Sequence, residues 1–116
     1  MDSLEDCPVK YALSLLSGKW KLRIIWELNQ QETLRFNELQ RRLEGVSSFM
    51  LAKCLEELEQ HKILLRTQYN EVPPRVEYSL SDLGRDIEPS LEMLAEWGLK
   101  AKSRILDKAS GENKTG

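Results

Sequence analysis

The chain has few of the residues from which metal sites and disulfide scaffolds are built. Its 116 residues include only two cysteines, Cys7 and Cys54, and one histidine. That is too few for a disulfide framework, and the spacing matches no zinc site. The sequence also has no glycine-rich phosphate loop and no ordered set of Ser, His and Asp. We therefore expect no enzymatic activity, no metal and no cofactor.

Long apolar runs are also absent. No segment approaches the roughly 20 apolar residues that a membrane-spanning helix requires. No charged-then-apolar signal segment opens the chain, so we expect a cytoplasmic protein that makes no membrane contact. Apolar residues make up 41% of the chain and charged residues 31%, which is typical of a soluble globular domain. We expect one domain over residues 1–109.

An excess of positive charge, the usual mark of a nucleic-acid-binding surface, is missing too. The formal net charge is −2. Residues 17–80 carry ten basic and nine acidic residues, residues 1–16 carry one and three, and residues 81–116 carry six and seven. The middle of the chain is the least acidic part, but this balance supports DNA binding only weakly.

What the sequence does contain is the pattern of a helix-turn-helix over residues 36–60. Residues 36–43 and 48–60 each place apolar residues at helical spacing, and residues 44–47 form a tight turn between them. Ser47 suits the N-cap of the second helix because its hydroxyl can accept an orphan backbone N–H. Two helices joined by a short turn that contains glycine are typical of proteins that place the second helix in a DNA major groove. The inner faces consist of Phe36, Leu39, Leu43, Leu51, Leu55 and Leu58.

A two-stranded wing is predicted directly after this pair of helices. Residues 63–69 and 76–80 are rich in β-forming residues, and the second segment alternates apolar with polar side chains. Pro73 and Pro74 stiffen the connection and prevent it from continuing either strand. The wing therefore spans residues 63–80.

Further helices are predicted on both sides of this unit. A first helix begins at Pro8, a second carries Trp20, Ile24, Ile25 and Leu28 on one face, and residues 34–35 form a very short strand. A last helix spans residues 89–108 and precedes a polar tail, residues 110–116, that we expect to be disordered. The fold class is mainly α (α+β), a winged helix-turn-helix with N- and C-terminal dimerisation helices. The last helix carries an apolar stripe that a second subunit would cover, formed by Leu91, Leu94, Ala101 and Ile105.

Candidate DNA contacts follow from this architecture. On the second helix, polar and basic residues lie near the N-terminal end and acids crowd the C-terminal half, which matches the helix dipole. Lys53 is favoured as a DNA contact over a solvated surface lysine. Arg75 is weighed evenly between DNA and an ion pair with Glu71 or Glu77. Lys19 and Lys21 lie near a helix start, where they hold phosphates or are simply exposed. The candidate DNA-binding residues are Ser47, Ser48, Phe49, Ala52, Lys53, Arg75, Lys19, Lys21 and Arg35.

Several motifs resemble a known family. They are Cys7-Pro-Val9, Gly18-Lys-Trp20, Arg35-Phe-Asn-Glu-Leu39, residues 51–59, the run from Glu71 through Val-Pro-Pro-Arg-Val-Glu-Tyr to Gly84, and Trp97-Gly98. In this order they resemble the HxlR-type winged-helix transcriptional regulators, which are relatives of the MarR group. The resemblance implies a homodimer that binds an inverted-repeat operator in double-stranded DNA. The chain departs from the family at Lys62, where glycine is common, and at Ala52 and Cys54.

The resemblance also bears on regulation. Several family members use the cysteine of the Cys-Pro-Val motif to sense electrophiles or oxidants, so Cys7 is the candidate redox-sensing residue. Its place before a helix favours the reactive thiolate, whereas Glu5 and Asp6 oppose it. A small-molecule effector near Trp20 and Trp97 is a further possibility. The alternative function is a winged-helix module for protein–protein assembly without specific DNA binding, which the acidic net charge supports.

Overall fold

The structure of the protein is a computed structural model that describes residues 7–115, with side chains described for residues 7–107. The chain divides into two compact units, Met1–Asp86 and Ile87–Gly116. The backbone is helical to Thr115, so a helix occupies residues 110–115, where we expected a disordered tail. Gly116 lies outside the described residues.

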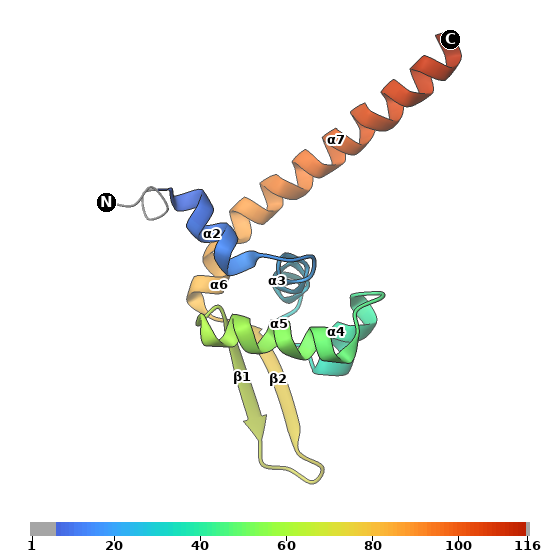
Figure 1. Cartoon of the computed structure of the whole chain (residues 1–116). Coiled ribbons are helices and arrows are strands. Elements are labelled where there is room, and N and C mark those ends of the chain that lie inside the picture. Colours follow the sequence, from blue (N-terminus) through green and yellow to red (C-terminus); the bar gives the residue numbers. More distant parts are fainter. Residues whose placement is uncertain (1–6, 116) are drawn as a thin grey trace. The chain divides into compact units, whose positions relative to one another are not determined.

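The first unit contains the helix-turn-helix and the wing (Figure 1). The mainly α fold with a two-stranded wing is thereby confirmed, and the second helix of the pair has the predicted bounds. Its elements in chain order are α2 (Pro8–Leu16), α3 (Lys21–Gln30), α4 (Phe36–Arg42), α5 (Ser48–Gln60), β1 (Leu64–Tyr69), β2 (Arg75–Leu80) and α6 (Asp82–Asp86).

Local hydrogen bonds fix where α4 and α5 begin. The Ser47 hydroxyl accepts the backbone N–H of Met50 at 3.0 Å, as an N-cap does. At α4, the carboxylate of Glu38 accepts the backbone N–H of Arg35 at 2.8 Å. Between the helices, Gly45 adopts a positive φ of 93°, a conformation that costs glycine little. The turn can therefore reverse the chain within a few residues.

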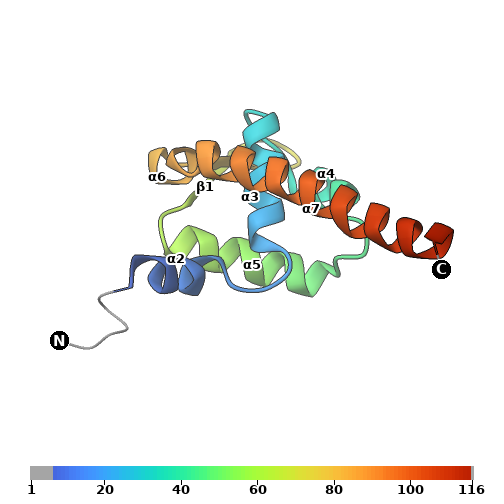
Figure 2. The same ribbon diagram turned by 90° about the horizontal axis from the view of Figure 1, so that it is seen from above.

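The core of this unit lies where α3 crosses α5, as Figure 2 shows from above. Apolar residues recur on one face of each helix, and burying each such side chain contributes about 1.5–3 kcal/mol. The crossing fixes α5 relative to α3 and leaves the opposite face of α5 in solvent. The core residues of α3, α4 and α5 are Ile24, Ile25, Leu28, Leu39, Leu51, Cys54, Leu55 and Leu58.

The wing is an antiparallel pair of strands that extends from the helices (Figure 1). Its register runs from Leu64 opposite Leu80 to Tyr69 opposite Arg75. The strands match the predicted segments to within one residue, because the alternation of side chains marks them in the sequence. The predicted short strand is a single bridge in which Leu34 exchanges two backbone hydrogen bonds with Tyr78, at 2.8 and 3.0 Å. This bridge joins the start of α4 to β2.

Ser81 connects the end of α5, the wing and α6. Its hydroxyl lies 2.6 Å from the carbonyl oxygen of Lys62 and 2.9 Å from that of Ile63, and it accepts the backbone N–H of Gly84 at 3.1 Å. Lys62 itself has a φ of 63°. Left-handed backbone is unfavourable for residues with a Cβ, which explains why glycine is common at this position in the family that the sequence resembles.

The second unit consists mainly of α7, Glu88–Thr115, which contains the predicted helix over residues 89–108. Leu91 is only 5% exposed and thus differs from the rest of the predicted stripe. No helix in the described part of the chain is long and apolar enough to cross a membrane. The large apolar side chains that α7 exposes are Met93, Leu94, Trp97, Leu99, Ile105 and Leu106.

A test of the junction at Ser81 is the substitution Gly84→Ala. A Cβ at this position would clash with the carbonyl oxygen of Ile63, so we expect a loss of about 1–3 kcal/mol in the free energy of unfolding. Gly98→Ala is the matched control, because a Cβ there meets nothing within 4 Å and alanine favours helix. Urea denaturation measures both variants, and equal stabilities would contradict the close packing at Gly84.

Candidate nucleic-acid interface

The outward face of α5 forms a continuous exposed stripe, which we call the α5 stripe. It consists of Phe49, Ala52, Lys53, Glu56 and Gln60, which line one shallow hollow together with Glu57. These positions face away from the buried leucines because α-helical side chains three, four and seven residues apart share a face. The sequence marks the first three of them as candidate DNA contacts, and the structure brings these three together.

The two serines at the start of α5 mainly position the helix. Ser47 caps it, and the hydroxyl of Ser48 accepts a hydrogen bond at 3.0 Å from the side-chain amide of Gln40 on α4. Gln40 also donates to the carbonyl oxygen of Val46 at 3.4 Å. The amide of Gln40 therefore ties the first helix of the pair to the start of the second.

Lys21, a candidate phosphate contact in the sequence, is buried against α5 and not exposed at the start of α3. Its side chain is 7% exposed, and its Nζ lies 2.9 Å from Oε1 of Glu57 on α5. This hydrogen bond and the charge of Lys21 lower the pKa of the Glu57 carboxyl below its usual value. Lys21 is thus an internal partner of α5, and it neutralises one of the acids that crowd the second half of that helix.

Lys19 remains available at the surface. Its Nζ lies 4.9 Å from the centroid of the Trp20 ring, and the guanidinium of Arg23 lies 5.0 Å from the same centroid. Cations stack favourably on aromatic faces, so Trp20 holds two positive charges near the start of α3. Lys19 and Lys53 line a common hollow, which makes this end of α5 locally basic. Arg23 was not among the candidate residues. Its spacing of three residues from Trp20, which places both on one face of a helix, could have indicated this contact.

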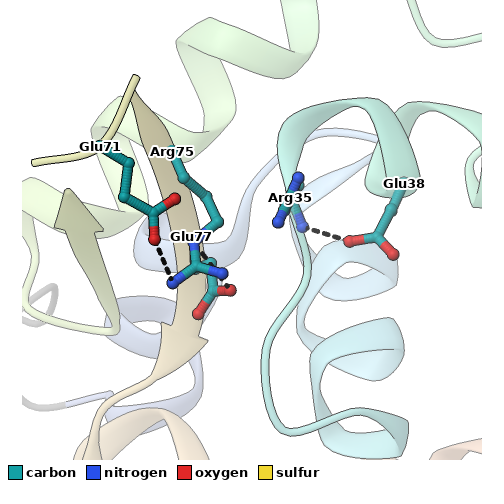
Figure 3. A network of polar contacts seen from close by, with 5 residues as sticks. All are labelled: Arg35, Glu38, Glu71, Arg75 and Glu77. Carbon is teal, nitrogen blue, oxygen red and sulfur yellow. Dashed lines mark hydrogen bonds and ion pairs between the residues drawn. The ribbon is translucent and has the colours of Figure 1, made fainter. Parts of the chain in front are cut away.

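Arg75 is held by carboxylates of the wing itself, as Figure 3 shows. One guanidinium nitrogen lies 3.2 Å from Glu71 and another 3.7 Å from Glu77. The guanidinium also stacks on Tyr69, with 4.2 Å between its carbon and the ring centroid. Of the two interpretations of Arg75 that the sequence left open, the ion pair is present in the structure.

Arg35 lies exposed at the start of α4, with Glu38 close by (Figure 3). Both residues line a polar hollow together with Arg41 and Glu77. Arg41 was not predicted as a DNA contact. The sequence indicates it through two consecutive arginines, Arg41 and Arg42, in the last turn of α4. Arg42 forms an ion pair with Glu27 of α3 at 3.2 Å.

The two cysteines differ in exposure. Cys7 is exposed and caps α2, where its sulfur accepts the backbone N–H of Lys10 at 3.4 Å. Cys54 is buried on the inner side of α5, and burial raises the pKa of its thiol, although the charge of Lys21 opposes that rise. A buried protonated thiol reacts slowly, so Cys7 is the more accessible nucleophile. Within the described residues, no group of three His, Cys, Asp or Glu side chains is placed to hold a metal ion.

Comparison with known proteins establishes the family. A model of the HxlR-like helix-turn-helix matches residues 15–105. The chain belongs to the HxlR family. The chain is also similar to an uncharacterised HTH-type transcriptional regulator of Halalkalibacterium halodurans. The two are 43% identical over 98 residues, which cover 84% of this chain and 87% of that protein.

Solved structures agree with this HxlR assignment. The redox regulator HypR in its oxidised form is 39% identical, with a TM-score of 0.76, and the match covers 81% of this chain and 96% of that one. The reduced form gives a TM-score of 0.80 at 36% identity, covering 85% and 97%. The HxlR-like chain is therefore a transcriptional regulator with a helix-turn-helix DNA-binding fold.

The pair of Lys21 and Glu57 predicts a specific dependence of stability on pH. Because the pKa of folded Glu57 is lowered, the stability that the pair contributes is fully present above the ordinary glutamate pKa of about 4.5. It is lost as the pH falls through the lowered value. We expect Glu57→Gln to be less stable than the parent at pH 7, and the difference to shrink toward pH 3.

Thermal unfolding between pH 3 and pH 7 measures this effect. Glu59→Gln is the matched control, since it removes an exposed carboxylate from the same helix and should leave the pH profile of the parent unchanged. A gap between Glu57→Gln and the parent that stays constant over this range would contradict the assigned pair.

Proposed function

We propose that this chain is a cytoplasmic, homodimeric regulator that binds an inverted-repeat operator through the α5 stripe. The observation that carries the proposal is the exposed face at the start of α5. Phe49, Ala52 and Lys53 point outward from a helix that is rigidly capped and buried on its other side. This is the arrangement by which a recognition helix enters a major groove.

Charge near α5 supports the same orientation. Lys19 and Lys53 lie together beside the first half of the helix, where they would meet phosphates on either side of the groove. Arg35 and Arg41 lie at the polar hollow of α4 and would contact the backbone of the same DNA. Arg75 would reach phosphate only by exchanging its carboxylate partners.

Exposed apolar side chains support a homodimer. On α2, Val9, Tyr11 and Leu13 are each more than half exposed. On α7, Leu94 is 50% and Trp97 66% exposed. Large apolar surfaces in water mark interaction sites, and a two-fold partner would cover both helices while presenting two α5 stripes to successive half-sites of the operator.

A redox-responsive role for Cys7 is supported by its exposure and by the similarity of the chain to HypR, a redox regulator. Because Cys7 caps α2, a covalent change at its sulfur would alter the start of a helix that we place in the dimer. Dimer geometry sets the separation of the two recognition helices. A local change at Cys7 would then alter the fit to both half-sites.

The first prediction from this proposal concerns Lys53. If its ammonium group neutralises a phosphate, Lys53→Ala should weaken operator binding and lower the slope of log affinity against log salt by about one unit. Fluorescence anisotropy at several salt concentrations measures both quantities. Lys100→Ala, which removes the same charge from α7, is the control and should leave the slope unchanged. If the parent protein does not bind DNA, or binds it independently of salt, the alternative function of a protein–protein assembly module is favoured.

A second prediction concerns the dimer. Leu94→Glu would bury an unpaired carboxylate between subunits, so we expect the dimer to dissociate roughly a hundredfold more readily. Analytical ultracentrifugation measures the dissociation constant. The control is Leu83→Glu, which adds the same charge to the exposed side of α6 and should remain dimeric. A tight Leu94→Glu dimer would place the interface elsewhere.

A third prediction concerns switching. Diamide should change operator affinity of the parent by about 5- to 150-fold, the usual range of allosteric coupling, and should leave Cys7→Ser unaffected. Serine is a good N-cap, so this variant retains the start of α2. Cys54→Ser is the matched control and should respond as the parent does. An equal response of Cys7→Ser and the parent would remove Cys7 from the mechanism.

A further inference from the structure

Phe49 is the most exposed aromatic side chain among the described residues, at 77%. It is the second residue of α5, a helix whose start is fixed by the Ser47 cap and whose inner face is buried at Leu51 and Leu55. The ring is therefore held in water by a rigid backbone. Exposed aromatic surface is unfavourable in water, so the position predicts that an apolar partner covers the ring.

The surroundings of Phe49 restrict what that partner can be. One turn further along α5 lie Ala52, a small apolar side chain, and Lys53, a cation, and all three line the same hollow. Glu56, Glu57 and Gln60 line its far end, where Lys21 neutralises Glu57. The start of the α5 stripe thus combines an apolar surface with an adjacent positive charge. A second copy of this chain that docked here with Lys53 at the two-fold axis would bring two Lys53 charges together. Duplex DNA instead supplies negative phosphates beside the groove edges.

The major groove offers one apolar group among the edges of the four unmodified bases, the 5-methyl of thymine. Phenylalanine and alanine are among the side chains that contact this methyl group. We propose that Phe49, with Ala52 beside it, recognises the 5-methyl of a thymine in each half-site of the operator. This inference rests on the proposed function and adds the base that the α5 stripe reads.

The proposal separates two contributions to binding. Lys53 would supply phosphate attraction, which weakens steeply with salt and carries no sequence information. Phe49 would supply sequence preference through an apolar contact, which is largely independent of salt. Loss of the phenyl ring should therefore weaken binding to the operator while leaving the salt slope unchanged.

The test compares thymine with deoxyuridine, which lacks only the methyl group and keeps every hydrogen-bonding atom of the base. Duplexes that the full-length protein prefers are first selected from random DNA. Each thymine of the selected site is then replaced singly by deoxyuridine, and affinity is measured by fluorescence anisotropy. We expect one or two positions in each half-site at which the parent binds roughly fourfold more weakly, the effect of exposing one methyl-sized group.

The same replacements should have a much smaller effect in Phe49→Ala, in which only small side chains are left beside the methyl group. Because Phe49 is exposed, this variant should fold normally, which circular dichroism and its melting temperature verify. Phe49→Leu keeps an apolar side chain and should restore part of the thymine preference. Leu83→Ala, which shortens an exposed apolar residue on α6, is the control and should retain full sensitivity to deoxyuridine.

The possible outcomes distinguish this inference from the proposed function. Sequence-specific binding that ignores every deoxyuridine replacement would overturn the thymine contact and leave the proposed function standing. Sensitivity that persists unchanged in Phe49→Ala would overturn the assignment to this residue. Failure of the parent to bind any DNA in a salt-dependent manner would overturn the proposed function and the inference together.

Discussion

Burial of the inner face of α5 against α3 and β1 is the constraint on which the remaining structure depends. Leu51, Leu55 and Leu58 are almost completely buried, and their burial fixes the orientation of the helix about its axis. Every outward side chain of α5 is then fixed in direction. The Ser47 cap sets the position of the helix along its axis, so burial and capping together determine which residues a DNA groove could meet.

Several basic side chains that could have contacted DNA form ion pairs within the protein instead. Lys21 pairs with Glu57, Arg42 with Glu27 and Arg75 with two glutamates of the wing. These pairs neutralise acids that would otherwise repel a polyanion. A chain with a net charge of −2 can therefore present a locally basic surface near Lys19 and Lys53.

The sequence predicted those features that have local causes. The bounds of α5 follow from a serine cap and helical spacing, and the wing from alternation of side chains. The pairs of Arg75 were foreseen as one of two alternatives because their partners lie within four residues. The role of Lys21 could not be foreseen, since its partner Glu57 lies far along the chain and only packing of α3 on α5 brings them together. The burial of Leu91 likewise depends on the folded chain.

The ion-paired wing has a consequence for how such a protein searches a genome. Arg75 carries one positive charge and its two carboxylate partners carry two negative ones, so this cluster has a net charge of −1 and would not attract a duplex. Non-specific DNA competes for a regulator in vast excess over its true site. A wing that attracts DNA of any sequence only weakly would leave more of the protein unbound by non-specific DNA. Discrimination between sites, measured as a ratio of affinities, is thereby favoured over total affinity.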